Sequence, residues 1–497
     1  MRTKIILSLL SVGLTACGGG GGSAQPPTGL SYSSPNSFVV GTPITALAPT
    51  VNGTVTSYSV APSLPGGLSL DMSSGAITGT PTTATPSASY VVTAQNDAGS
   101  ATFSLSITVD PAFALQPSTA TTIAVGQVID AYPTIESSSA SPYPAFVDAS
   151  QVAWTSSQPS VASVGADGSI TGMSEGSTTV TANYQGPGYQ GLAVQLVVQV
   201  SGYMLKRNLA VAGQGTRSYS IYVPNFTASG AHPLLVSMHG GGGTAMIQAS
   251  TTQLNQFASA HDFYVAYLEG SGVIQTFNAG ACCGSAQTND VDDVAYATAV
   301  IDDVQANYSV DPTKTFASGF SNGSMMAHRL ACAIADRIAG IAAVSGGSGE
   351  FDGALNQYYT CSPSRPIRIL HIHATNDRNY PYAGGVGAGI SNTNFYPIDS
   401  TIADWIARNN VTTQATVEHV TATTTCYHYE NAADNSKPSA PVTLCKIDPV
   451  DVYDPVNQVV WGGGHSWPGG VRSPASKSDI PIADFDADSY LWNYLNQ

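Results

Sequence analysis

Gly319-Phe320-Ser321-Asn322-Gly323 is the stretch that decides the fold of the second half of this 497-residue chain. The run Lys314-Thr315-Phe316-Ala317-Ser318 precedes it and predicts a strand, whereas residues 325–332 predict a helix. A serine between a strand and a helix in the pattern G-x-S-x-G is typical of a nucleophile elbow. Side chains two positions before and after so exposed a serine would collide, so glycine stands at both places. Because glycine makes up 50 of 497 residues, the pattern arises easily by chance, and the assignment depends on partners further along the chain.

The composition limits the class of protein. Hydrophobic residues make up 43% of the chain, which is enough for packed cores and excludes global disorder. The length suggests about two to four domains. With 32 acidic residues against 16 Lys plus Arg, the formal net charge is -16, so phosphates would be repelled. We therefore expect neither nucleic acid nor an anionic lipid surface as a partner.

Residues 1–17 have the features of an export signal. A basic start is followed by an apolar run that is too short to remain as a membrane span. The run ends in Leu14-Thr15-Ala16-Cys17, which resembles the lipobox of bacterial lipoproteins and implies that Cys17 is acylated; an ordinary secretory signal cut near Ala16 is the alternative. Glycine rather than aspartate follows the cysteine, which by the lipoprotein sorting rule implies an outer-membrane location, periplasmic or at the cell surface. Residues 18–29 are rich in glycine and proline and predict a flexible tether.

Apart from the lipobox cysteine, six cysteines lie in the second half of the chain: Cys282, Cys283, Cys332, Cys361, Cys426 and Cys445. An even number in an oxidising compartment favours disulfides over metal ligands or free thiols. Six cysteines allow about fifteen connectivities. Nearness in the chain favours Cys332–Cys361 and Cys426–Cys445, which leaves the adjacent Cys282 and Cys283 as a strained third pair.

Residues 30–109 predict an Ig-like β-sandwich, because short runs alternate at period two between turn signals and no helical period occurs. The runs Leu64–Leu70 and Gly75–Pro81 resemble the Ig-like domains of bacterial surface proteins. Residues 110–201 predict a second sandwich, which resembles the group-two bacterial Ig-like domain in its W-x-S-S, V-A-x-V and G-x-I-T-G runs. Neither sandwich carries a cluster of catalytic residue types. We interpret both as spacers; binding of a polysaccharide or another surface is the alternative.

Residues 202–497 predict an α/β domain with a largely parallel sheet, because strands alternate with helices. The predicted strands are residues 218–223, 233–238, 263–268, 314–318, 366–373 and 458–461. The predicted helices are residues 252–260, 292–308, 401–409 and 488–495.

The predicted strand 233–238 ends in His239-Gly240-Gly241-Gly242-Gly243-Thr244. In an acyl-transfer enzyme such a loop presents bare backbone N–H groups to a developing oxyanion, so we assign this role to Gly241 together with the N–H of Asn322. The stretch also satisfies a dinucleotide-binding pattern, but the nearby acid, Asp262, precedes the next strand instead of ending it. A flexible turn is the remaining alternative.

Asp377 is the first carboxylate after the predicted strand 366–373. A catalytic imidazole needs a buried carboxylate to hold one tautomer and to stabilise its cation. Alternatively, His371 and His373 face the same side of this strand and could bind a metal, although no third ligand stands at a suitable spacing.

The histidine must follow in the order Ser, Asp, His. Three histidines follow the acid: His419, His428 and His465. His419 and His428 flank a polar, Thr-rich stretch and are predicted at the surface. His465 lies in the Gly-rich loop 462–470 after a predicted strand, from which it can reach the elbow.

These motifs together resemble the polyhydroxybutyrate depolymerase/feruloyl esterase family over about residues 205–497. The resemblance is carried by five stretches: Gly319–Gly323 with residues 325–339, Cys282-Cys283-Gly284, Val291-Asp292-Asp293-Val294, Leu370-His371-Ile372-His373 and residues 462–470. It implies an α/β-hydrolase fold with a catalytic triad of Ser321, Asp377 and His465. Ser324 and Ala374 depart from the family, which often has glycine there, and the glycine loop lacks a common cysteine; these departures leave the substrate open.

The resemblance implies a serine esterase that needs no cofactor or metal and acts on hydroxyalkanoate-type polyester oligomers or on feruloyl and acetyl esters. Its partners would be an ester substrate, polymeric or not, and the membrane through Cys17. Trp467, two residues after His465, is predicted as an apolar wall beside the ester, with a packed structural role as the alternative. A cell-surface adhesin or polysaccharide-binding protein with a non-catalytic hydrolase-like domain is the alternative function.

Overall fold

A computed structural model describes residues 25–116, 120–136, 145–186, 191–389, 391–449, 452–454, 459–461, 464–472 and 478–497. The lipobox with Cys17 and most of the predicted tether lie outside these residues. The chain divides into two compact units, one up to Pro111 and one from Ala112 onward. Within the described part of the chain, no helix has the length and apolar character needed to cross a membrane.

The first unit is an Ig-like β-sandwich, as predicted. Its four-stranded sheet has the order β2 (Asn36–Val39), β8 (Gly99–Asp110), β7 (Thr85–Asn96) and β4 (Ser57–Ala61). Two smaller antiparallel pairs are β1 (Thr28–Ser31) with β3 (Thr50–Asn52), and β5 (Leu68–Leu70) with β6 (Ile77–Gly79). Leu105, Ile107 and Val109 alternate along β8 with partly exposed residues and are fully buried, so one face of the sheet forms the core.

The second unit begins with another β-sandwich. Its strands are β9 (Ala112–Gln116), β10 (Thr121–Val125), β11 (Val128–Asp130), β12 (Tyr132–Glu136), β13 (Ala145–Phe146), β14 (Val152–Ser156), β15 (Ala162–Val164), β16 (Ser169–Gly172), β17 (Gly176–Tyr184) and β18 (Ala193–Val211), with a 3₁₀ turn at Ala149–Gln151. Ile123, Ile170, Val180 and Val198 are fully buried and form its core.

An α/β domain follows in the same unit, and its sheet is continuous with β18. The order after β18 is β19 (Gly215–Val223), β21 (Tyr264–Leu268), β20 (His232–Met238), β22 (Val310–Phe320), β23 (Gly340–Val344), β24 (Arg368–Ala374), β29 (Val442–Ile447), β28 (Thr424–Tyr429) and β27 (Thr416–His419). The pairs from β21 through β29 are parallel, as predicted. Parallel strands buried on both faces put the carboxyl ends of several strands at one edge, where a site can form.

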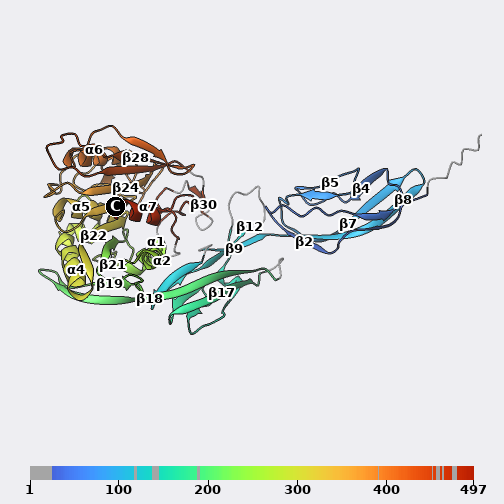
Figure 1. The fold of residues 1–497 in the computed structure, drawn as a ribbon, viewed down its shortest axis with the longest axis horizontal. Coiled ribbons are helices and arrows are strands. Elements are labelled where there is room, and N and C mark those ends of the chain that lie inside the picture. The colour runs from blue at the N-terminus through green and yellow to red at the C-terminus, as the bar shows by residue number, and fades with distance from the viewer. Residues whose placement is uncertain are drawn as a thin grey trace, which may run out of the picture. The chain divides into compact units, whose positions relative to one another are not determined.

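Helices cover both faces of this sheet. They are α1 (Ala245–Thr252), α2 (Leu254–His261), α3 (Gly284–Thr288), α4 (Asp293–Asn307), α5 (Asn322–Ala333), α6 (Ile398–Arg408) and α7 (Ala487–Leu495). Figure 1 shows α4 and α5 on one side of the strands and α1, α2 and α7 on the other. Two buried clusters match this arrangement, because residues of α4, α5 and α6 pack in one and residues of α1, α2 and α7 in the other.

Two details of the sheet differ from the sequence prediction. The predicted strand 458–461 is β31 (Val459–Trp461), but it pairs only with β30 (Val452–Asp454) outside the main sheet; β25 (Gly385–Val386) and β26 (Asn394–Phe395) form another small pair. The strand next to β24 is instead β29, which the sequence did not predict. β29 is buried on both faces, so it lacks the alternation that marks a half-exposed strand.

The second sandwich packs on the α/β domain through buried polar contacts. The predicted boundary at residue 201 falls inside β18, which pairs with β17 before that residue and with β19 after it. Asn255 Nδ2 donates to Gln127 Oε1 at 2.6 Å, and the hydroxyl of Tyr267 donates to Asn255 Oδ1 at 2.8 Å. Gln127 is only 1% exposed. These contacts do not fit a loosely attached spacer.

We therefore expect a chain that begins near Ser201 to be less stable than one that begins at Ala112. The shorter chain loses the strands that pair with the first half of β18 and the hydrogen bond between Gln127 and Asn255, and each such hydrogen bond contributes about 0.5–1.5 kcal/mol. Thermal unfolding should show a melting temperature lower by at least ~5 °C. The chain beginning at Ala112, which lacks only the first unit, should unfold like the full-length protein. Equal melting temperatures for the two shortened chains would contradict this view of the interface.

Candidate active site

Ser321 stands at the sharp turn between β22 and α5. Its backbone has φ 56° and ψ −118°, a region that residues with a side chain rarely occupy. A Cβ added at Gly319 would overlap the carbonyl of Gly323, and a Cβ added at Gly323 would overlap the carbonyl of Met238. The structure thus confirms the steric reason for both glycines of the G-x-S-x-G pattern.

The structure brings Ser321, Asp377 and His465 together from three separate parts of the chain. The Nε2 atom of His465 lies 2.9 Å from Ser321 Oγ, and its Nδ1 atom lies 2.8 Å from Asp377 Oδ2. Asp377 and His465 are 4% and 5% exposed, respectively. An ionised carboxylate can only accept, so His465 carries its proton on Nδ1 and presents the lone pair of Nε2 to the serine hydroxyl. This arrangement can remove the proton of Ser321.

The second oxygen of the Asp377 carboxylate is also fixed. It accepts the backbone N–H groups of Asn379 at 2.8 Å and Tyr380 at 2.9 Å, in the turn that follows β24. Three hydrogen bonds therefore hold this carboxylate in one orientation toward His465.

Asp479 is a residue of the site that the sequence did not single out. The backbone N–H of His465 donates to Asp479 Oδ2 at 2.8 Å, and the N–H of Asp479 donates to the carbonyl of His465 at 2.8 Å. Burial by itself would lower the pKa of His465, but the charge and hydrogen bond of Asp377 and the charge of Asp479 raise that pKa above its ordinary value of 6.5. The fourteen-residue separation of these two residues follows no motif, so the sequence carries no signal for this pairing.

The Gly-rich loop after β20 lies beside the nucleophile. A Cβ added at Gly240 would lie 3.1 Å from Ser321 Cβ, so the loop backbone approaches the serine closely. Gly241 and Asn322 both line the cavity that contains Ser321. Within the described residues, the backbone N–H of neither one donates to another group of the protein. Both N–H groups are therefore available to a ligand in the cavity, and their role in holding an oxyanion stays a prediction.

His239 fixes this loop, a role that the sequence analysis did not assign. The backbone N–H of Gly270 donates to His239 Nε2 at 2.9 Å, so the ring proton is on Nδ1 and donates to the carbonyl of Gly240 at 2.7 Å. Burial lowers the pKa of His239 to about 4. The ring is therefore neutral at physiological pH and acts as a clamp on the loop.

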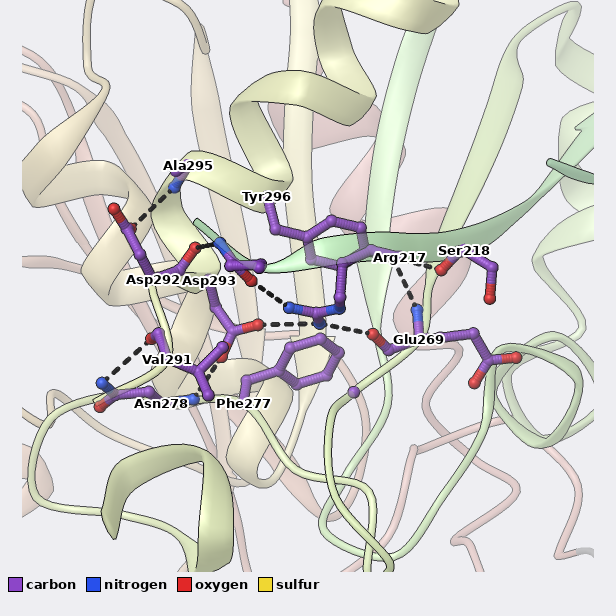
Figure 2. A network of polar contacts seen from close by, with 12 residues as sticks. Arg217, Ser218, Glu269, Phe277, Asn278, Val291, Asp292, Asp293, Ala295 and Tyr296 are labelled. Carbon is purple, nitrogen blue, oxygen red and sulfur yellow. Dashed lines mark hydrogen bonds and ion pairs between the residues drawn. The ribbon is translucent and has the colours of Figure 1, made fainter. Parts of the chain in front are cut away.

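A second clamp holds the loop that faces α5. The side chain of Asn322 accepts the N–H of Phe277 at 2.7 Å and donates to the carbonyl of Phe277 at 3.0 Å. The next N–H, of Asn278, donates to the buried Asp293 at 2.7 Å, and Asp293 pairs with Arg217 at 3.0 Å. Figure 2 shows the part of this network around Asn278, Asp293 and Arg217. The Arg217 guanidinium lies 3.8 Å from the centre of the Tyr296 ring. The loop is therefore anchored on α4 and β19 in addition to the hydrogen bonds of its own turns.

The cavity that contains Ser321 and His465 has a volume of about 590 Å³. Apolar side chains form much of its lining: Ile247, Val273, Ile274, Phe320, Met325 and Phe395. Val273 and Ile274 are exposed to solvent as well. Such a cavity suits a small, largely apolar substrate group held against a few polar atoms.

All three disulfides favoured by the sequence are present: Cys282–Cys283, Cys332–Cys361 and Cys426–Cys445. The vicinal pair Cys282–Cys283 lines the cavity. The other two lie in the core clusters on opposite faces of the sheet.

Trp467 is not a substrate wall. It is fully buried, its indole N–H donates to the buried Asp488 at 2.9 Å, and it is not part of the cavity lining. The packed structural alternative is therefore the correct one for this residue. The reason is that the chain turns after His465, so the next aromatic ring enters the core on the side of α7.

Apart from His465 and His239, no histidine of the described residues belongs to the cavity lining. His419 is exposed on β27, as predicted, whereas His428 on β28 is partly buried and contacts Glu418 at 3.1 Å. His371 and His373 do not converge on a common point, because their ring nitrogens hydrogen-bond to each other at 3.2 Å. Among the described residues, no group of three or more His, Cys, Asp or Glu side chains could hold a metal ion.

Comparisons with known proteins agree with this architecture. Residues 22–110 match the family described as "Putative Ig domain", residues 106–186 the bacterial Ig-like domain (group 2), and residues 226–396 the phospholipase/carboxylesterase family. These assignments are independent of the geometry above.

Three curated relatives are similar to the second half of the chain. "Feruloyl esterase B" of Piromyces equi is 29% identical over 48% of this chain, and the chain spans 41% of that protein. "Putative esterase NocK" of Nocardia uniformis subsp. tsuyamanensis is 30% identical over 53% of this chain and 74% of its own length. "Feruloyl esterase C" of Emericella nidulans is 31% identical over 37% of this chain and 64% of its own length. The chain therefore belongs to the carboxylesterase family of α/β-hydrolases represented by these esterases, with two Ig-like domains in front of its hydrolase domain.

Proposed function

We propose that the protein is a serine carboxylic-ester hydrolase in which Ser321 is the nucleophile, His465 the general base and Asp377 the residue that orients it. One observation carries the proposal: hydrogen bonds run without a gap from Ser321 Oγ through both nitrogens of His465 to the Asp377 carboxylate. The same order and geometry define the Ser-His-Asp triad on other folds.

In this mechanism His465 Nε2 takes the proton of Ser321 as Oγ attacks the ester carbonyl. The N–H groups of Gly241 and Asn322 stabilise the oxyanion that forms. His465 then gives its proton to the departing alcohol, which leaves an acyl group on Ser321. Water, activated by the same imidazole, releases the acid and restores the serine. Asp377 stabilises the imidazolium in both halves of the cycle.

We propose feruloyl-type, acetyl and other short-chain esters, together with hydroxyalkanoate oligomers, as substrates. The apolar cavity of about 590 Å³ supports a compact acyl or aromatic group, and the feruloyl esterases among the relatives support the same class. The Ig-like domains are rich in Thr, Ser and Gly and poor in the aromatic residues that would hold an insoluble polyester.

We also propose that the enzyme is exported and anchored to the outer membrane through Cys17, as the lipobox Leu14-Thr15-Ala16-Cys17 suggests. Cys17→Ser should then release the protein from the membrane fraction with its esterase rate unchanged. A Cys17→Ser variant that stays in the membrane fraction would contradict the lipid-anchor proposal.

Replacing either Ser321 or His465 by Ala should lower kcat/KM for p-nitrophenyl butyrate by about four to six orders of magnitude, because members of a triad act as a unit. Circular dichroism should show that both variants fold. His419→Ala and His428→Ala serve as matched controls and should be nearly silent, since neither residue lines the cavity. A fluorophosphonate probe should label the wild type and not Ser321→Ala; a wild type that resists labelling would favour a non-catalytic, adhesive role.

The rate should depend on the protonation of His465. Because the pKa of His465 is raised, the imidazole becomes protonated at a higher pH than usual, and a protonated imidazole cannot accept the serine proton. We expect kcat/KM to fall on the acid side with a midpoint above pH 6.5. Asp479→Asn removes one charge that raises this pKa and should move the midpoint to lower pH. A rate that stays flat down to about pH 4 would mean a different base.

Substrate choice can be ranked with a panel of p-nitrophenyl, feruloyl, acetylxylan and hydroxyalkanoate oligomer esters beside crystalline polyhydroxybutyrate granules. The soluble esters should be cleaved well ahead of the granules, because the Ig-like domains are poor in the aromatic residues that would hold an insoluble polymer. Rapid clearing of a granule suspension by the purified protein would reverse this ranking.

A further inference from the structure

A row of three histidines lies in the core beside the site, and the proposed mechanism does not use it. His328 on α5 and His371 and His373 on β24 are all 0% exposed. His328 Nε2 lies 3.2 Å from His371 Nδ1, and His371 Nε2 lies 3.2 Å from His373 Nδ1. Three polar rings in a hydrophobic core are costly unless every ring is hydrogen-bonded, so the row needs an explanation.

One end of the row fixes the proton of every ring. The indole N–H of Trp405 on α6 can only donate, and it lies 3.0 Å from His328 Nδ1. His328 therefore carries its proton on Nε2 and donates to His371. By the same reasoning His371 donates to His373, which is left with its proton on Nε2. The indole donor at this end and the carbonyl of Tyr380 at the other, which can only accept, both require this direction.

The other end of the row reaches the turn that carries Asp377. His373 Nε2 lies 2.9 Å from the carbonyl of Tyr380 and 3.5 Å from Asp377 Oδ2. The N–H of the same Tyr380 donates to the other oxygen of the Asp377 carboxylate. The ring of His373 therefore touches both the turn and the carboxylate that His465 contacts.

The surroundings keep the row neutral. Burial lowers the pKa of His328 to about 3, and it also lowers the pKa of His371 and, despite the opposing charge of Asp377, of His373. At the Trp405 end of the row, the charge of Arg408 acts on His328. At the other end, the rings of Tyr380 and Tyr382 face His373. Because the row begins at the indole of Trp405, which does not ionise, the row cannot supply protons to the site. Its N–H dipoles, however, all point toward Asp377.

We propose that His328, His371 and His373 are positioning residues that hold Asp377 in the orientation needed by His465, with Trp405 as the donor that fixes the first ring of the row. The proposal rests on the proposed triad. Reversing the tautomers would turn the lone pair of His373 Nε2 toward the Tyr380 carbonyl and the Asp377 carboxylate, which would repel it. The indole of Trp405 opposes the reversal at the other end, so removing it leaves the row held in its direction at one end only.

Trp405→Phe tests the proposal, because it removes the donor and keeps an aromatic ring. We expect kcat on p-nitrophenyl butyrate to fall by about 10- to 100-fold with KM within about twofold, since a slightly misplaced triad loses rate rather than binding. The acid midpoint of kcat/KM should move to lower pH, because a less well placed Asp377 raises the pKa of His465 less. The polar groups that face His465, namely Asp377, Asp479, His373 and Ser321, all keep their chemical identity in this variant, so a moved midpoint reports on their placement.

Trp492→Phe is the matched control. Trp492 is also buried, with 4% exposed against 0% for Trp405, but it lies in the core cluster on the opposite face of the sheet, stacked on Phe263. Trp492→Phe should reduce the melting temperature without moving the acid midpoint or kcat.

At the centre of the row, His371→Gln can both accept and donate and should retain more activity than His371→Leu, which can do neither.

Two further readouts separate this proposal from the proposed function. Nitrogen-15 spectra of histidine-labelled protein should report protons on Nε2 for all three rings, with those signals changed in Trp405→Phe, and they need no substrate. The labelling rate with a fluorophosphonate should fall in Trp405→Phe in parallel with kcat, whatever the natural ester is. Wild-type kcat, labelling rate and acid midpoint in Trp405→Phe, or protons on Nδ1 in the row, would overturn the positioning role while leaving the triad intact. Loss of labelling in the wild type would instead remove the proposed function.

Discussion

The close contact between the start of α5 and the end of β20 is the constraint on which the site depends. Gly323 meets the carbonyl of Met238 with no space for a side chain, so the helix that follows Ser321 begins directly against the strand that carries the glycine loop. The nucleophile and the N–H groups of the loop consequently share one cavity. The positive φ of Ser321 costs about 1–3 kcal/mol, and hydrogen bonds from its N–H to Val344 and from the Met325 N–H to its carbonyl help to hold it in place.

Two buried polar networks approach this elbow from opposite directions. On one side the Arg217–Asp293 pair holds the loop that Asn322 grips, and on the other the histidine row ends at the turn of Asp377. In each network the buried donors and acceptors named here are paired, which is the condition under which buried polar groups add rigidity instead of instability. The loop beside Asn322 and the turn that carries Asp377 are thus each held by several hydrogen bonds. A triad that works at hydrogen-bond precision needs such support, because small displacements are costly in rate.

How much of this could be predicted from the sequence depended on whether the signal was local. The elbow, the glycine loop and the chain order of Ser321, Asp377 and His465 were readable, because residue type and spacing encode them. Asp479, His239 and the Arg217–Asp293 pair were not, because their partners come together only in the folded chain. Trp467 was misassigned as a wall because neighbours in sequence can point to opposite sides of a loop, and β29 was missed because a strand buried on both faces does not alternate. The predicted boundary at residue 201 falls inside β18. The strand continues through this residue, and only its pairing partner changes there, from β17 to β19.

The pairing of β18 also has a mechanical consequence. β10 pairs with β18 in parallel, and β18 continues without a break into the hydrolase sheet. A pull applied between the N-terminal side of β10 and the hydrolase acts on these two strands in opposite directions along their length. It therefore loads all the hydrogen bonds between them together, in shear, instead of opening them one after another. For an enzyme that we propose to be tethered at its N-terminus, this ladder would act as a force-bearing clamp that lets drag on a bound substrate reach the tether before it unfolds the site.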